Sequence, residues 1–117
     1  MGAIVSVTIG LPVPELEAAT KWYRQLLGSV EEMDPAPGVR EFSLTPTCWL
    51  QIFEVDTSEP NPAVLRFESS DIAASHALVL NLATDVGEIE SVPGVVAYFE
   101  FRDPSGNPLS FYQLLDE

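Results

Sequence analysis

A turn near the C-terminus, residues 101–109 with the sequence Phe-Arg-Asp-Pro-Ser-Gly-Asn-Pro-Leu, constrains the fold more than any other segment. Two apolar runs, residues 95–99 and 109–112, flank this turn. Proline fixes φ, glycine and asparagine accept positive φ, and aspartate bonds its own backbone, so this composition favours a chain reversal. The segment therefore predicts a β-hairpin with a tightly specified loop.

One pattern occurs twice along the chain. A shift of 56 residues places residues 15–18 on residues 71–74, and the same shift places the strand-like residues 7–9 on residues 63–65. In both halves the strand is followed by a helix signal and then by three short β-like runs. We therefore expect two βαβββ modules in tandem.

The expected elements follow from periodicity and from breaker residues. In the first module we expect strands near residues 4–10, 29–33, 39–44 and 49–55, and a helix from about Glu15 to Leu27 that is closed by Gly28. In the second module we expect strands near residues 63–68, 86–91, 95–101 and 109–114, and a helix over 72–83 with Asp71 as its N-cap. The stretch 56–62, rich in proline and small polar residues, is the expected linker.

Four segments together resemble the vicinal oxygen chelate superfamily, which includes glyoxalase I, bleomycin-resistance proteins and extradiol dioxygenases. These segments are residues 5–11, residues 13–16, Trp22-Tyr23 with Leu27-Gly28, and residues 103–107. One departure is Glu15, where the family usually has aspartate. The resemblance implies an α+β fold for a single domain, residues 1–117. Module one (about 3–56) and module two (about 63–115) would form a cup-shaped mixed sheet of the glyoxalase/bleomycin-resistance/dioxygenase type.

Charge and cysteine content restrict the partners. Eighteen acidic residues against five basic ones give a formal charge of −13. Such a charge repels phosphate backbones and anionic lipid, so we expect neither nucleic-acid nor membrane binding, although a preference for cationic ligands stays open. Without a long apolar run or an apolar leader, the chain is expected to be soluble and cytoplasmic. Cys48, the single cysteine, is expected to be a small packed residue.

The resemblance also implies four positions that hold a divalent metal in related enzymes. A catalytic metal needs about three imidazole or carboxylate donors. The sole histidine, His76, lies in the second expected helix, and an all-carboxylate site would require Glu54 and Glu68 to converge. We therefore expect no metal and no cofactor, and neither glyoxalase I nor dioxygenase activity. The four implied positions are Thr8, Gln51, Val64 and Ser110.

Side-chain alternation turns a larger set of residues toward the same cup. Aromatic walls combined with hydrogen-bonding groups suit a small organic ligand. We therefore expect a binding protein that holds a small, partly aromatic or hydrophobic molecule in the cup. The expected ligand-binding residues are Thr8, Trp49, Gln51, Phe53, Val64, Arg66, Glu68, Ser110 and Tyr112.

Two other functions stay open. The chain could be an enzyme of the same family, a lyase, isomerase or dioxygenase-like protein, either metal-dependent through unrecognised donors or using Glu68 as base with Arg66 or Tyr112 as electrophilic help. It could also be an interaction module with a filled pocket. Arg66 and Glu68 share a face of one strand, so we expect an ion pair between them; alternatively, Arg66 grips a ligand carboxylate or phosphate. Because the resembled proteins often dimerise, we expect a homodimer.

Overall fold

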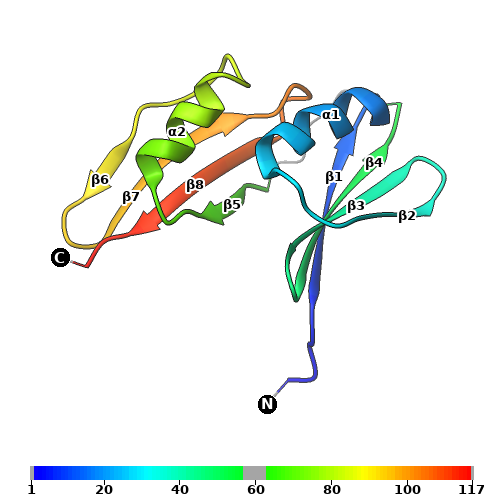
Figure 1. The fold of residues 1–117 in the computed structure, drawn as a ribbon, viewed down its shortest axis with the longest axis horizontal. Coiled ribbons are helices and arrows are strands. Elements are labelled where there is room, and N and C mark those ends of the chain that lie inside the picture. Colours follow the sequence, from blue (N-terminus) through cyan, green and yellow to red (C-terminus); the bar gives the residue numbers. More distant parts are fainter. Residues whose placement is uncertain (1, 57–62, 117) are drawn as a thin grey trace. The chain divides into compact units, whose positions relative to one another are not determined.

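The computed structural model describes residues 2–56 and 63–116, and the chain divides into two compact units, residues 1–60 and 61–117. Each unit contains one helix and a four-stranded mixed sheet (Figure 1). The prediction of an α+β chain built from two βαβββ modules is therefore confirmed. The linker expected at 56–62 lies outside the described residues, except for Asp56.

The first unit is a sheet with the strand order β1-β4-β3-β2. β1 runs parallel to β4, and the remaining neighbours are antiparallel. α1 packs against β3 and β4. The elements are β1 (Val7–Val13), α1 (Leu16–Leu27), β2 (Glu32–Ala36), β3 (Val39–Thr45) and β4 (Cys48–Glu54).

The second unit repeats this topology with the strand order β5-β8-β7-β6. β5 runs parallel to β8, and β7 is antiparallel to both of its neighbours. α2 packs against β7 and β8. The elements are β5 (Leu65–Glu68), α2 (Ile72–Leu80), β6 (Glu90–Val92), β7 (Val96–Arg102) and β8 (Pro108–Leu114).

Several element boundaries differ from the expected ones. β1 continues to Val13 instead of ending at residue 10, and it contains Pro12, which an edge strand tolerates because one side of its backbone needs no partner. β2 begins at Glu32 because residues 28–31 bring the chain from the end of α1 back to the sheet. α2 ends at Leu80, three residues early. The strand expected at 86–91 is only a bridge at Val86 followed by β6.

An aromatic cluster joins helix and sheet in the first unit. Tyr23 of α1 is fully buried, with its ring 6.3 Å from Phe42 of β3 and 4.9 Å from Trp22. Leu50 and Ile52 of β4 are fully buried on the same side of the sheet. Burial of each such side chain stabilises the unit by roughly 1.5–3 kcal/mol, so these residues fix α1 on one face of the sheet.

The core of the second unit is a row of phenylalanine rings on the side of α2. Phe99 lies 5.7 Å from both Phe101 and Phe111, and Phe67 lies 5.2 Å from Phe111. The His76 ring of α2 stands edge-on to Phe99 at 4.7 Å, with its Nε2 2.9 Å from the Gly87 carbonyl oxygen. The expectation that His76 lies in a helix, away from the strand positions that hold metal in the resembled enzymes, is confirmed.

The predicted hairpin loop joins β7 to β8, as expected. Asp103 is buried, and its carboxylate accepts hydrogen bonds from the Ser105 N–H at 2.9 Å and the Asn107 N–H at 2.8 Å. The Asn107 side-chain amide donates a third bond to Asp103 at 2.9 Å. Gly106 has a φ of 88°, a conformation that glycine adopts without strain.

Among the described helices, neither is long and apolar enough to cross a membrane.

Candidate functional site

Each sheet has one face that packs against its helix and one that does not, which we term the helix-free face. In the first unit, Leu11, Leu50 and Ile52 are buried on the helix side. Because strand side chains alternate, the residues between them lie on the helix-free face. Strand register places four predicted residues together there: Thr8 lies opposite Trp49 on β4, and Gln51 and Phe53 follow along that strand.

Local contacts fix the side chains of this face. The Gln51 Nε2 donates a hydrogen bond of 2.7 Å to the Glu41 carboxylate, its cross-strand neighbour on β3. Phe53 leans over Gly10, because a Cβ added at Gly10 would lie 3.2 Å from its ring. Trp49, Gln51 and Phe53 are half-buried, whereas Thr8 is exposed. The first helix-free face thus combines two aromatic rings with an amide that is already hydrogen-bonded.

The predicted residues of the second unit also share one face. Arg66 of β5 lies opposite Ser110 of β8, and Glu68 lies opposite Tyr112. The phenylalanine cluster occupies the other side of these strands, so alternation places all four on the helix-free face. Val64 precedes β5 and is 41% exposed.

The predicted ion pair between Arg66 and Glu68 is wrong. Arg66 instead pairs with Glu100 of β7, with 3.4 Å between its Nη1 and the Glu100 Oε2. Both residues lie opposite Ser110, whose small, fully buried side chain leaves space for the long arginine to reach over β8. The Ser110 hydroxyl donates a hydrogen bond of 3.0 Å to the Phe99 carbonyl oxygen. Within the described ranges, Glu68 forms no ion pair.

A hollow of about 570 Å³ lies on the helix-free face of the second unit. Tyr98 and Tyr112 are directly opposed on β7 and β8, and we call this site the tyrosine hollow. Two of its residues, Arg66 and Tyr112, are among the predicted ligand-binding residues. The other three lie on β7, and the predicted hairpin with side-chain alternation would have found them. The lining residues are Arg66, Val96, Tyr98, Glu100 and Tyr112.

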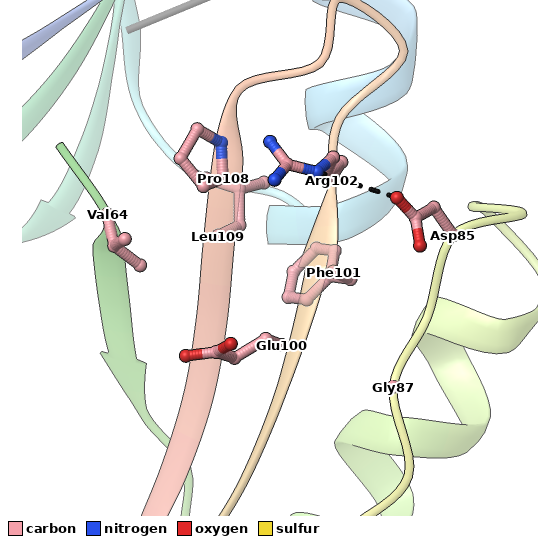
Figure 2. A pocket seen from close by; sticks show the side chains of 8 residues that line it. All are labelled: Val64, Asp85, Gly87, Glu100, Phe101, Arg102, Pro108 and Leu109. Atoms are coloured by element: carbon pink, nitrogen blue, oxygen red, sulfur yellow. Dashed lines mark ion pairs between the residues drawn. The ribbon is translucent and has the colours of Figure 1, made fainter. Parts of the chain in front are cut away.

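A second hollow, of about 450 Å³, lies where β7 ends and β8 begins (Figure 2). Val64 stands on one side of it, and Arg102 forms an ion pair with Asp85 on the other, with 3.5 Å between Nε and Oδ2. Glu100 also lines this hollow, and Figure 2 shows its carboxylate directed toward β8. Glu100 therefore lines both of these hollows, and its ion pair with Arg66 lies on the side of the tyrosine hollow.

A third hollow, of about 320 Å³, lies in the first unit and is lined by two arginines, one on α1 and one on β3. Arg24 of α1 donates two bonds of 2.9 Å to Glu32, and Arg40 of β3 donates bonds of 2.7 and 3.1 Å to Asp34. These hydrogen bonds lower the pKa of the Glu32 and Asp34 carboxyls and raise the pKa of both guanidinium groups. Because carboxylates already occupy both arginines, this hollow offers little to an anionic ligand.

The positions that the resemblance implies for a metal do not fit one. Val64 has no donor atom, the Ser110 hydroxyl is buried and bonded to a carbonyl oxygen, and the Gln51 amide is bonded to Glu41. Neutral hydroxyls and one neutral amide, whose nitrogen is bonded to Glu41, do not supply the imidazole or carboxylate set that a divalent metal needs. Within either unit, the described residues also contain no group of three His, Cys, Asp or Glu side chains that could hold a metal.

Comparison with known proteins gives a likeness in structure but none in sequence. No family model and no curated protein sequence matches the chain. A glyoxalase/bleomycin-resistance protein from Catenulispora acidiphila DSM 44928 is 22% identical with a TM-score of 0.76, over 94% of this chain and 98% of its own. TnmS3, an antibiotic binding protein from Streptomyces sp. CB03234, is 21% identical with a TM-score of 0.79, over 97% of this chain and 99% of its own.

A lactoylglutathione lyase from Agrobacterium tumefaciens is also similar, with 19% identity and a TM-score of 0.72, over 97% of this chain and 95% of its own. The chain has the glyoxalase/bleomycin-resistance fold. Proteins described as a lyase and as an antibiotic binder share this fold, so the fold alone does not choose between catalysis and binding. The structure brings eight of the nine predicted residues together in two sets of four, one on each helix-free face, whereas Val64 precedes β5 and lines the second hollow. The cup that would join the two sets stays a prediction.

Proposed function

We propose that this chain is a glyoxalase/bleomycin-resistance-like binding protein that holds a small, partly aromatic organic molecule without a metal. The tyrosine hollow is the main support, because its volume of about 570 Å³ falls in the range of roughly 300–1,000 Å³ typical of ligand sites. Tyr98 and Tyr112 offer flat apolar surface, and Arg66 and Glu100 offer polar groups that can orient a ligand.

The donor chemistry supports binding over metal-assisted catalysis. In the resembled enzymes, a metal ion bound at four strand positions acts as the Lewis acid, and two of those positions are Val64 and Ser110 in this chain. The similarity to TnmS3, described as an antibiotic binding protein, is consistent with a binding role. The homodimer and the cytoplasmic location rest on the sequence and stay predictions.

The test is an NMR titration of the full chain with 2-naphthol, a neutral aromatic probe, before and after treatment with EDTA. We expect saturable shifts of the Val96, Tyr98 and Glu100 amides that EDTA does not change. Tyr98→Ala should weaken binding at least about tenfold, because it removes one wall of the hollow. Leu80→Ala is the matched control, since Leu80 is 54% exposed on α2, away from this face.

A metal analysis tests the part of the proposal that says no metal is bound. After incubation with zinc, nickel, manganese and iron(II) salts followed by dialysis, we expect no stoichiometric metal. Tight retention of one ion per chain, or probe binding that depends on such an ion, would overturn the metal-free proposal. Turnover of an aldehyde, epoxide or catechol that Glu68→Gln abolishes would favour the enzyme alternative instead.

A further inference from the structure

The arginines of this chain differ in how their guanidinium groups are used. Arg24 and Arg40 each present the Nε–Nη2 edge to one carboxylate, Glu32 and Asp34 respectively, at distances of 2.7–3.1 Å. Arg102 uses Nε for its pair with Asp85 and Nη1 for a bond of 2.9 Å to the Gly106 carbonyl oxygen. In these three arginines, Nε is thus occupied from within the chain.

Arg66 is different. Among the described residues its one polar contact is from Nη1 to Glu100 at 3.4 Å, which is long for a hydrogen bond with charge on both partners. Its side chain is 48% exposed and lines the tyrosine hollow. The Nε–Nη2 edge therefore presents two parallel N–H donors that no described residue uses. Such an edge matches the two oxygens of a carboxylate.

The tyrosines lie one row away from this edge on the same face. Arg66 and Ser110 form one row across the sheet, and Tyr112 and Tyr98 belong to the next. Residues two apart along a strand are separated by about 7 Å. A carboxylate joined to one or two fused rings can span that spacing, with its charged end at Arg66 and its ring against the tyrosines.

We propose that the tyrosine hollow takes a small aromatic carboxylate, held by the Nε–Nη2 edge of Arg66 and by the rings of Tyr98 and Tyr112. This inference rests on the proposed function and specifies its ligand class. The charge of −13 does not prevent it, because exposed charges more than about 8 Å away are largely screened at physiological ionic strength. Glu100 stays on Nη1, so the ligand does not have to displace it.

The competing class is an aromatic amine. Glu68 and Glu100 both lie on this face, and either could accept a hydrogen bond from an ammonium group. The directional argument favours the carboxylate, since Arg66 supplies two fixed donors to one planar group, whereas an exposed glutamate supplies one flexible contact. An experiment on ligands of equal shape and different charge separates the two.

The experiment compares three probes of one shape: 2-naphthoate, 2-naphthalenemethanol and 2-naphthylmethylamine. The full chain is titrated at pH 7 in 150 mM sodium chloride, and the Tyr98, Glu100 and Tyr112 amides are followed by NMR. We expect 2-naphthoate to bind at least about tenfold more tightly than the other two, as a charge-assisted bidentate contact predicts. Arg66→Gln should remove this preference, and Arg66→Lys, which keeps the charge without the fork, should lose most of it.

Lys21→Gln is the control for net charge, because it removes one positive charge from an exposed position on α1. It should leave the preference for 2-naphthoate unchanged. If the alcohol binds as tightly as the acid, if the amine binds best, or if Arg66→Gln keeps the preference in a folded protein, the ligand class is wrong while aromatic binding stands. If none of the three probes shifts these amides at millimolar concentration, the proposed function itself fails at this hollow.

Discussion

At the scale of the residue, Asp103 shows how one buried carboxylate organises a hairpin loop. Its two oxygens accept bonds from two backbone N–H groups and one side-chain amide, all between 2.8 and 2.9 Å. Asn107 is fully buried beside it, so the two bonds from Asn107 are shielded from water. Asp103 therefore links three donor groups of the loop through one side chain.

Replacement of Asp103 by alanine should lower the free energy of unfolding by about 3 kcal/mol, because it removes the acceptor of two buried hydrogen bonds from Asn107. Urea denaturation followed by circular dichroism measures this change. Asp85→Ala is the control, since Asp85 forms a single exposed ion pair and should cost less than about 1 kcal/mol. A cost below about 1 kcal/mol for Asp103→Ala would show that the loop is held by other contacts.

Sequence could predict the role of Asp103 but not the partner of Arg66. The bonds of Asp103 reach only two and four residues ahead, so turn chemistry is enough. The partner of Arg66 is 34 residues away on β7, across β8. Local spacing favoured Glu68 because it is the acidic residue nearest on the same face. Only the strand order and the small Ser110 between Arg66 and Glu100 decide the pairing.

At the scale of the element, the two helices begin at equivalent positions of the repeat but are capped differently. Asp71 caps α2, accepting a bond of 3.1 Å from the Ala74 N–H. Glu15, at the corresponding position of α1, makes no side-chain cap. The Glu54 carboxylate at the end of β4 takes the place of this cap, because it accepts a bond of 2.9 Å from the Leu16 N–H. The repeat in sequence therefore predicted where each helix begins, but not which side chain satisfies its first N–H groups.

Substitution of the two N-cap residues should reveal this asymmetry. Asp71→Ala should destabilise the chain by about 1 kcal/mol, the usual cost of a lost N-cap, whereas Glu15→Ala should change stability by no more than a few tenths, about 0.3 kcal/mol. Glu54→Ala removes the acceptor of Leu16 and should cost about 1 kcal/mol. Chemical denaturation of the three variants compares them directly. An equal loss in the Asp71 and Glu15 variants would contradict the assigned roles.

Two arginine pairs tie β2 to the rest of the first unit. Arg24 of α1 binds Glu32 at the start of β2, and Arg40 of β3 binds Asp34 within it. These bonds lower the pKa of both carboxyls in the folded chain. Because the folded pKa is below the unfolded one, the pairs stabilise the fold above the unfolded values, about 3.9 for aspartate and 4.3 for glutamate. That stabilisation is lost as the pH falls through the folded pKa values.

We therefore expect stability to decrease as the pH falls below about 4.5, with part of the loss due to these two groups. Glu32→Gln should reduce the slope of stability against pH in that range, because one depressed carboxyl is removed. Glu31→Gln is the matched control, since Glu31 contacts β3 through its backbone carbonyl, which accepts a bond from Ser43. Urea denaturation between pH 3 and 7 gives the slopes, and identical slopes for the two variants would contradict the assignment.

Which side chains share a face of a strand was easier to predict than where the strand ends. β1 lies three residues further along than expected, yet Thr8 still lies on the helix-free face. Alternation is set by buried residues such as Leu11 and Val13, and it does not depend on where pairing begins or stops. Strand ends depend on which backbone groups find partners across the sheet, and local sequence does not record that.

At the scale of the whole molecule, the order of elements along the chain was the most predictable feature. Two βαβββ modules follow from the turn, the repeat and the apolar periodicity, because each of these signals is local. The tyrosine hollow was partly predicted, since Arg66 and Tyr112 came from alternation, and the same alternation applied to the predicted hairpin would have added Tyr98 and Glu100. The ligand class could not be predicted, because it depends on which edge of Arg66 its neighbours leave unused.

Because of the net charge of −13, the stability of the chain should increase as the salt concentration rises. Each of the four arginines already has a carboxylate partner, and eighteen acidic groups share only five basic ones, so the acidic groups far outnumber the positive charges that could offset them. Salt weakens these few pairs but also screens the more numerous repulsions, because the Debye length falls from about 30 Å at 0.01 M to about 10 Å at 0.1 M. Repulsion destabilises a compact state, and its screening should therefore dominate.

We expect the midpoint of thermal unfolding at pH 7 to rise by about 4 °C between 10 and 300 mM sodium chloride, which corresponds to about 1 kcal/mol for a chain of this size. Differential scanning calorimetry measures the shift. The control is the same series near the isoelectric point of about 4.1, where the net charge vanishes and the rise should disappear or reverse. A midpoint that falls with salt at pH 7 would mean that the arginine pairs outweigh the repulsion among the remaining carboxylates.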